Sequence, residues 1–256
     1  MNSSRHLALA CLVAALAAGP AALASNTFTD QITTDTYLDS SSPTANFGLS
    51  GNDKVVINST SMCRTLFDLP TSLWSYAPGD ILSASVSFYV WSDSSATYNV
   101  SLFPLTTAFV EGTGGKNGKI PADGATWLTY DGTHSWTAAG GDFDSAYSVV
   151  GTKGPIGVNP SDSNGRFFTF DITSLLSNPT AASELENFGA MLRIDETVPP
   201  SGQRYDSFTS ANSTSYSIPY LPSIEVTVVP EPSISALGAL GLAALASFFK
   251  QRKTRP

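Results

Sequence analysis

Cysteine is scarce in this chain of 256 residues, which contains only Cys11 and Cys63. Cys11 lies in an N-terminal segment that we expect to be removed, and one remaining cysteine cannot form an internal disulfide. Packing or a bound ion must therefore hold the domain together. We expect Cys63 to be a small buried apolar residue, a common environment for an unpaired cysteine.

Histidine is equally rare, and His134 is the only one outside that N-terminal segment. It lies in a glycine-rich stretch without a cysteine or second histidine nearby, so neither a nucleophile-base pair nor a histidine zinc site is supported. The sequence also contains no phosphate-binding loop and no dinucleotide fingerprint. These absences predict a protein that is not an enzyme and has no catalytic residue. Its many carboxylates leave a polysaccharide hydrolase or lyase as the least favoured alternative.

Positive charge is scarce between residues 25 and 229. This stretch has eight lysine and arginine residues against twenty aspartate and glutamate residues, a net charge of −12, whereas the whole chain carries −8. Nucleic-acid binding needs basic stripes, so the acid excess argues against nucleic acid as a partner. It is compatible with neutral sugars, divalent cations and an exported surface.

The N-terminus has the pattern of a secretory signal peptide. Arg5 and His6 precede an apolar run over residues 7–16, and Ala22-Leu23-Ala24 supplies a cleavage pattern of small residues. We therefore expect residues 1–24 to be a signal peptide that is cut after Ala24.

The C-terminus combines a rigid breaker, an apolar span and a basic stop. Pro230-Glu231-Pro232 precedes an apolar run over residues 233–249, and four of the residues 250–255 are basic. The length of the run suits a short transmembrane helix, and the cations after it favour a cytoplasmic C-terminus. The two prolines separate this helix from the folded body.

This order resembles the PEP-CTERM sorting signal of bacteria that produce exopolysaccharide. The resemblance implies that an exosortase-type membrane protease recognises the segment and cuts it near Pro230, Glu231 and Pro232. The protein would then be exported through the inner membrane, anchored there transiently, and finally placed on the cell surface or outside the cell.

The body between residues 25 and 229 has an all-β pattern. In residues 81–91, Ala84, Val86, Phe88 and Val90 alternate with Ser85, Ser87, Tyr89 and Trp91. A strand sends these two sets to opposite faces. Further strands are expected at 34–38, 54–57, 64–69, 98–102, 167–170, 188–194 and 223–228, with a hairpin turn at 93–96 and a short polar helix or turn near 180–187. These elements predict a single domain with an antiparallel, jelly-roll-like β-sandwich fold.

Residues 111–164 form the longest stretch without a clear strand pattern, except near 147–150. Loops of this length in a compact domain are usually functional or disordered. Because Trp127 and Trp136 lie within it, we expect an ordered loop that packs on the sandwich.

Several blocks of the body resemble DNRLRE-type domains, a β-sandwich group that includes carbohydrate-binding modules. The blocks follow one another in the order Asp35-Thr36-Tyr37-Leu38, Asn46-Phe47-Gly48, Phe67-Asp68-Leu69-Pro70, Ala84 to Tyr89, Gly140-Gly141-Asp142, Phe170-Asp171-Ile172-Thr173, Phe188-Gly189 and Phe208-Thr209-Ser210. The resemblance extends over residues 30–228. It implies a sandwich that binds polysaccharide.

Candidate sugar-binding residues are Tyr89 and Trp91, because sugars stack on flat aromatic faces. The alternative is that a second sheet or the long loop covers both rings. Arg193 and Arg204 lie in blocks that match the family and could donate hydrogen bonds to a sugar. They are equally suited to pair with nearby aspartates.

Candidate calcium ligands are Asp142, Asp144 and Asp195, which lie in the tightest acidic groupings. Calcium binds six to eight oxygen atoms, including backbone carbonyls, so alternating aspartates in a glycine loop are suitable. The alternative is that these carboxylates cap turns on a solvated face.

Together, these observations predict an exported bacterial surface or extracellular-matrix protein that is not catalytic and associates with exopolysaccharide. The main alternative is a structural biofilm or envelope component that assembles with itself and binds no sugar. A structural calcium ion is the one cofactor that the sequence suggests.

Overall fold

The computed structural model describes residues 25–93, 98–156, 165–194 and 204–229. The predicted signal peptide, most of the predicted hairpin turn, Asp195 and the sorting segment from Pro230 onward lie outside these residues. Within them, no helix has the length and apolar character needed to cross a membrane. Residues Thr27–Val228 form one compact unit.

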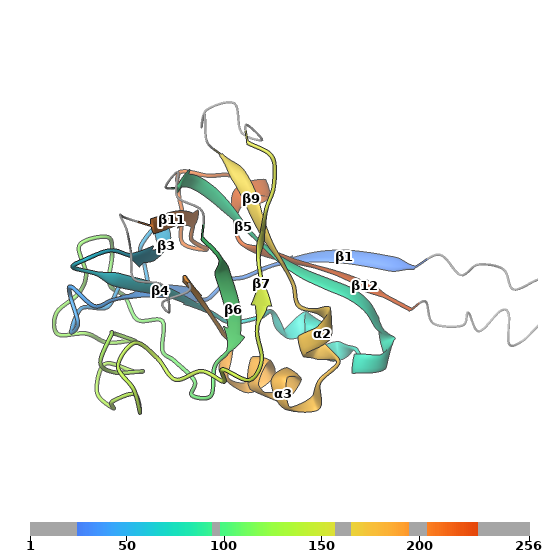
Figure 1. Cartoon of the computed structure of the whole chain (residues 1–256), viewed down its shortest axis with the longest axis horizontal. Coiled ribbons are helices and arrows are strands. Elements are labelled where there is room, and N and C mark those ends of the chain that lie inside the picture. The colour runs from blue at the N-terminus through green and yellow to red at the C-terminus, as the bar shows by residue number, and fades with distance from the viewer. Residues whose placement is uncertain (1–24, 94–97, 157–164, 195–203, 230–256) are drawn as a thin grey trace, which may run out of the picture. The chain divides into compact units, whose positions relative to one another are not determined.

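The longest strand, β5 (Ile81–Asp93), forms where the sequence alternates most clearly. Its apolar set, Ala84, Val86, Phe88 and Val90, is buried, as the alternation predicts. β5 pairs along one edge with β12 (Ser223–Val228) and β11 (Arg204–Thr209), and along the other with β9 (Arg166–Asp171). It is the central strand of the fold (Figure 1).

The described strands are hydrogen-bonded into one curled antiparallel sheet, which confirms the all-β prediction. Its order is β1-β12-β5-β11-β3-β4-β10-β6-β7, with β2 beside β4 and β8 beside β9. The remaining bounds are β1 (Asn26–Gln31), β2 (Asp35–Asp39), β3 (Asn52–Ile57), β4 (Met62–Phe67), β6 (Val100–Pro104), β7 (Val149–Val150), β8 (Thr152–Lys153) and β10 (Ala190–Ile194). The sequence did not predict β1, β8 or β11.

The helices are short. They are α2 (Thr173–Leu176), α3 (Pro179–Phe188) and the 3-10 helices η1 (Thr71–Ser75), η2 (Pro78–Asp80) and η3 (Ile218–Tyr220). α3 confirms the predicted polar helix. Asn178 caps its start by accepting hydrogen bonds from two backbone amides, and Pro179 occupies the first turn, where no amide partner is lost. Gly189, with φ of 81°, ends it.

The main core lies inside the curled sheet and is rich in phenylalanine. Phe88 of β5 contacts Phe67 of β4 edge to face, with ring centroids 5.1 Å apart, and Phe208 of β11 at 5.5 Å. α2 and α3 add Leu175 and Leu185 to the same core. Each fully buried ring or leucine contributes roughly 1.5–3 kcal/mol of transfer free energy.

A second core lies under the long irregular segment. Trp127 and Trp136 from this segment pack with Leu66 of β4 and Met191 of β10. The Nε1 of Trp136 donates a 2.9 Å hydrogen bond to the carbonyl of Thr126, so its polar atom is satisfied. For residues 111–156, the part of the segment that the structure describes, the prediction of an ordered segment packed on the sheet is confirmed.

Arg64 joins the segment to β4. Its guanidinium lies 5.0 Å from the centroid of Trp127 and 5.8 Å from that of Phe143, and it donates a 2.7 Å bond to the carbonyl of Gly140. Gly140 has φ of 93°, and a side chain there would collide with Arg64 and Trp127. The close approach therefore requires glycine at this position.

Candidate functional site

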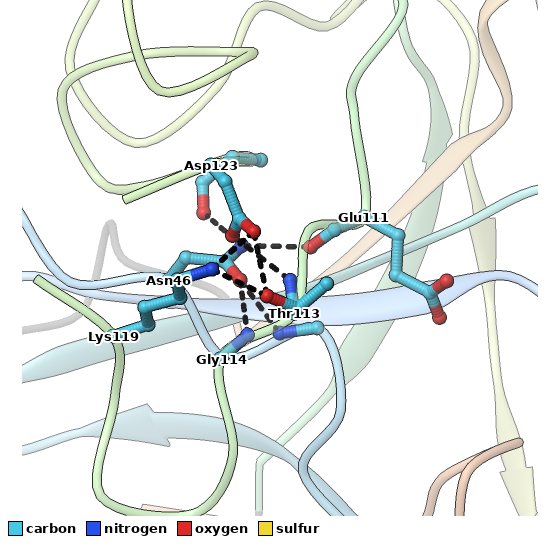
Figure 2. Close-up of polar contacts among 8 residues, drawn as sticks. Asn46, Glu111, Thr113, Gly114, Lys119 and Asp123 are labelled. Carbon is cyan, nitrogen blue, oxygen red and sulfur yellow. Dashed lines mark hydrogen bonds and ion pairs between the residues drawn. The ribbon is translucent and has the colours of Figure 1, made fainter. Parts of the chain in front are cut away.

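Asn46 is the hub that fixes the start of the long segment (Figure 2). Its side chain is fully buried. The Nδ2 group donates to the carbonyls of Glu111 and Ala125, at 2.7 and 2.9 Å, and Oδ1 accepts from the amides of Gly48 and Gly114, at 3.2 and 2.8 Å. One side chain thus satisfies four backbone groups of two distant loops.

The side chain of Glu111 points away from this hub in Figure 2 and belongs to a second polar group. Its Oε1 accepts hydrogen bonds from the backbone amide of Asp35, at 3.2 Å, and from Nδ2 of Asn212, at 2.9 Å. Asp35 itself accepts from Ser210 Oγ at 2.8 Å and from the amide of Ala211 at 2.6 Å. Segments 175 residues apart in sequence therefore meet at Asp35.

Asp53 completes this group, which we call the acid centre: Asp35, Asp53 and Glu111. Asp53 lies opposite Phe208 of β11, and Ser210, two residues farther along the chain, donates to Asp35, so the end of β11 brings the two carboxyl groups near each other. Asp35 and Asp53 are 0% and 1% exposed. Neither oxygen of Asp53 has a hydrogen-bond partner among the residues that the structure describes.

Ionisation of all three carboxyl groups of the acid centre is electrostatically unfavourable. Burial, followed by the charge of Asp35, holds the pKa of Asp53 well above its usual range. Burial likewise raises the pKa of Asp35 to about 6, despite the hydrogen bonds from Ala211 and Ser210. Two neighbouring buried carboxyl groups do not both ionise unless a cation compensates their charge, and otherwise one of them keeps its proton.

A cavity of about 480 Å³ lies beside the acid centre. We call it the Trp74 cavity, after the indole of η1 in its wall, and its polar lining includes Asp30, Gln31, Asp68, Glu186 and Asn187. Thr34, which directly precedes Asp35, also lines it. A second hollow of about 210 Å³ shares Trp74 and Glu186 and is otherwise largely apolar. The indole thus forms part of the wall of two adjacent hollows.

Asp68 is the most perturbed carboxyl of the Trp74 cavity. Burial, followed by the charge of Glu111, raises its pKa to about 6. Gly189 packs directly against it, since a side chain at Gly189 would lie 2.5 Å from Asp68 Oδ1. A cavity that holds one indole, two amides and three carboxyl groups has the composition of a site for a polar ring such as a sugar.

Tyr89 and Trp91 are not an exposed platform. Tyr89 is 0% exposed, and its ring packs against Tyr220, Tyr216 and Phe167, with centroids 4.8, 5.5 and 5.6 Å away. The expectation of an exposed ring at Tyr89 is wrong: the residue lies opposite the apolar row, but Tyr216 and Tyr220 cover that face of β5. Trp91 is half-buried.

Arg193 and Arg204 lie on different strands, β10 and β11, which are not neighbours in the sheet. The guanidinium of Arg193 lies 4.8 Å from the ring centroid of Phe143 and 5.7 Å from that of Phe103. Arg204 is half-buried and lies opposite Ile57 of β3. The structure therefore does not gather the predicted sugar-binding residues into one site.

Asp142 and Asp144 cap turns, which is the alternative that the sequence left open. Asp142 accepts from the amides of Thr137 and Ala138, at 2.8 and 2.9 Å, and Asp144 accepts from Ala146 at 2.7 Å. Asp195 lies outside the described residues. In the described part of the chain, no three histidine, cysteine, aspartate or glutamate side chains are grouped as a metal-ligand set.

His134 is exposed, and its Nδ1 lies 2.7 Å from Asp131 Oδ2. It also stacks on Tyr130, with ring centroids 5.7 Å apart. Its partners are thus those of a surface turn.

Sequence reasoning missed both Trp74 and Asp53. Trp74 follows a Phe-Asp-Leu-Pro block and lies in a short 3-10 helix, which has no periodicity to mark it. Asp53 occupies the first buried position of β3, where Asp53, Val55 and Ile57 alternate with half-buried residues. A charged residue at the start of an inward-facing row was the available signal.

No family model matches this sequence, and no curated protein matches it.

Proposed function

We propose that this chain is an exported, non-catalytic surface or matrix protein whose body binds a neutral polysaccharide in the Trp74 cavity. In this proposal the body is a jelly-roll-like sandwich of DNRLRE type, and the Pro230-Glu231-Pro232 tail is a removable PEP-CTERM address. The tail proposal rests on the order of its residues, and the binding proposal rests on the cavity.

The cavity carries the proposal because it combines the parts that sugar recognition uses. Trp74 offers an apolar ring face, and Gln31 and Asn187 offer amides beside it. Oε1 of Gln31 is buried without a hydrogen-bond partner among the described residues, so it can accept from a ligand hydroxyl. Stacking supplies affinity, and the fixed polar groups supply orientation.

The charge of the cavity selects the class of sugar. Asp30, Asp68 and Glu186 line it, and no lysine or arginine does among the described residues. Carboxylates accept hydrogen bonds from neutral hydroxyls but repel the carboxylates of uronic acids. The expected ligand is therefore a neutral glycan.

Calorimetric titration with neutral oligosaccharides and with uronic-acid oligosaccharides tests this proposal. We expect binding of a neutral series only, and Trp74→Ala should weaken it at least tenfold. Trp91→Ala is the matched control, since it removes the same side chain outside the cavity and should leave affinity unchanged. Binding that depends on Trp91 instead would contradict the proposal that the glycan binds in the Trp74 cavity.

Failure to bind any glycan, together with concentration-dependent assembly in light scattering, would favour the self-assembling component. Release of reducing ends from a polysaccharide would show an enzyme. Mass spectrometry of both ends of the protein from its native host tests the proposed sorting signal. An intact C-terminal tail on the exported protein would contradict its removal.

A further inference from the structure

Asp53 is a buried carboxyl group without a hydrogen-bond or ion-pair partner among the described residues. Its side chain points with Val55 and Ile57 toward the core side of β3, and it lies opposite Phe208 of β11. It is 1% exposed, and both of its oxygens lack hydrogen-bond partners among the described residues. An ionised carboxylate in such a place costs several kcal/mol unless something positive contacts it.

The neighbours of Asp53 supply more negative than positive charge, and Lys54 is a described cation whose charge lowers the pKa of Asp53. The negative charges of Asp35 and Glu111 both raise the pKa of Asp53, and that of Glu111 also raises the pKa of Asp35. Lys54, the next residue, lies with its Nζ 4.9 Å from the ring centroid of Tyr37. Among the residues that the structure describes, no lysine, arginine or histidine forms an ion pair with the acid centre.

The hydrogen bonds around Asp35 hold its carboxylate in place and leave part of its acceptor capacity unused. Ser210 Oγ and the amide of Ala211 each donate to one of its oxygens. A carboxylate oxygen has two lone pairs, so both oxygens can still accept a further partner. Asp35 is thus oriented by two donors and keeps lone pairs for a further partner.

We propose that Asp35 and Asp53 bind one divalent cation of the calcium type. A hard cation prefers oxygen ligands and accepts carboxylates together with hydroxyl, carbonyl and water oxygens. Only two carboxylates coordinate it, so no set of three acidic side chains is required. Ser210 Oγ, hydrogen-bonded to Asp35 Oδ1, is a neutral oxygen held beside them. Glu111 adds negative charge beside the site through a side chain held by Asn212.

This site ties together parts of the chain that are remote in sequence. Asp35 begins β2, Asp53 lies at the start of β3, and Ser210 directly follows β11. A cation there crosslinks three strands in a domain whose only cysteine cannot form an internal disulfide. The inference is independent of polysaccharide binding.

Calcium titration into the chelator-stripped full chain tests the proposal. We expect one bound ion per chain by calorimetry and a melting temperature about 5–10 °C higher in excess CaCl2. Asp53→Asn should abolish both responses. In chelator, this variant should melt at or above the wild-type temperature, since a neutral amide replaces a buried charge.

Asp144→Asn is the matched control, because it removes a carboxylate from a capped turn and should keep the full calcium response. Hydrogen exchange of the wild-type chain locates the ion without any variant. Calcium should slow exchange at Asp53 and Ala211 at least tenfold and leave Ala146 unchanged. Absence of calcium binding, a response that survives Asp53→Asn, or protection confined to residues 142–146 would overturn the proposal.

Discussion

Lys153 Nζ lies 2.8 Å from Oδ1 of Asp206, whose side chain is 0% exposed. The same ammonium lies 3.3 Å from Oδ2 of Asp93, which also faces Arg166 at 3.3 Å. Burial raises the pKa of Asp206, and the contact with Lys153 opposes that rise. The short strand β8 is therefore attached to β5 and β11 by charge.

Replacing Lys153 with methionine should destabilise the domain by about 2–3 kcal/mol, because it leaves the buried Asp206 without its cation. Urea unfolding followed by circular dichroism measures this. Lys153→Met combined with Asp206→Asn should recover much of the loss. The same substitution at Lys119, whose partner Asp123 is exposed, should have no measurable effect. Equal losses in the single and double variants would contradict the ion-pair account.

Replacing Asn46 with alanine should cost about 3–5 kcal/mol, because four backbone groups lose their partner at a buried position. Hydrogen exchange at Gly114 should become at least tenfold faster, since its amide donates to Asn46 Oδ1. Asn58→Ala removes only a turn cap at Thr60 and Ser61 and serves as the control. Unchanged exchange at Gly114 would show that the segment is held by the tryptophans alone.

The raised pKa of Asp68 predicts a pH dependence of stability in chelator. Burial raises the pKa of Asp68 from 3.8, the ordinary value for aspartate, to about 6, so the folded state binds this proton more tightly than the unfolded chain does. That contribution is complete below the unfolded pKa and is lost as pH rises through about 6. Between pH 5 and pH 7.5 the free energy of unfolding, measured by urea titration, should fall less in Asp68→Asn than in the wild type. The difference should be about 1 kcal/mol after allowance for solvent screening. A wild-type slope in this variant would exclude Asp68 as a source.

Cys63 should be unreactive in the folded protein. It is 5% exposed, and burial, followed by the charge of Asp39, raises the pKa of its thiol to about 12. Only the thiolate reacts quickly, so a disulfide reagent should label Cys63 at least a hundredfold more slowly in buffer than in urea. Fast labelling of the native protein would show that β4 opens locally.

The sequence predicted the strands whose burial follows the period of two. In β5 the row Ala84, Val86, Phe88 and Val90 needed no tertiary information, because apolar side chains on one face must leave water. The same alternation placed Tyr89 outward and could not say what covers that side. Tyr220, more than a hundred residues later, covers it.

The strand β11 could not be found by pattern because all its buried residues except Phe208 are polar. Asp206, Ser207 and Thr209 are buried there, and Asp206 tolerates its position because Lys153 approaches from another strand. The acid centre was missed for a similar reason. Asp53 is marked in sequence only by its place in the inward-facing row of β3, and nothing in the sequence pairs it with Asp35 of β2.

The second core under Trp127 and Trp136 makes the irregular segment indispensable to the sheet it covers. Loops usually tolerate shortening because little apolar surface depends on them. Here, trimming the segment would leave Leu38, Leu66 and Met191 facing solvent. Variation in length should therefore be confined to its exposed turns, such as the one around Thr133, while the stretches that carry the two indoles keep a fixed spacing.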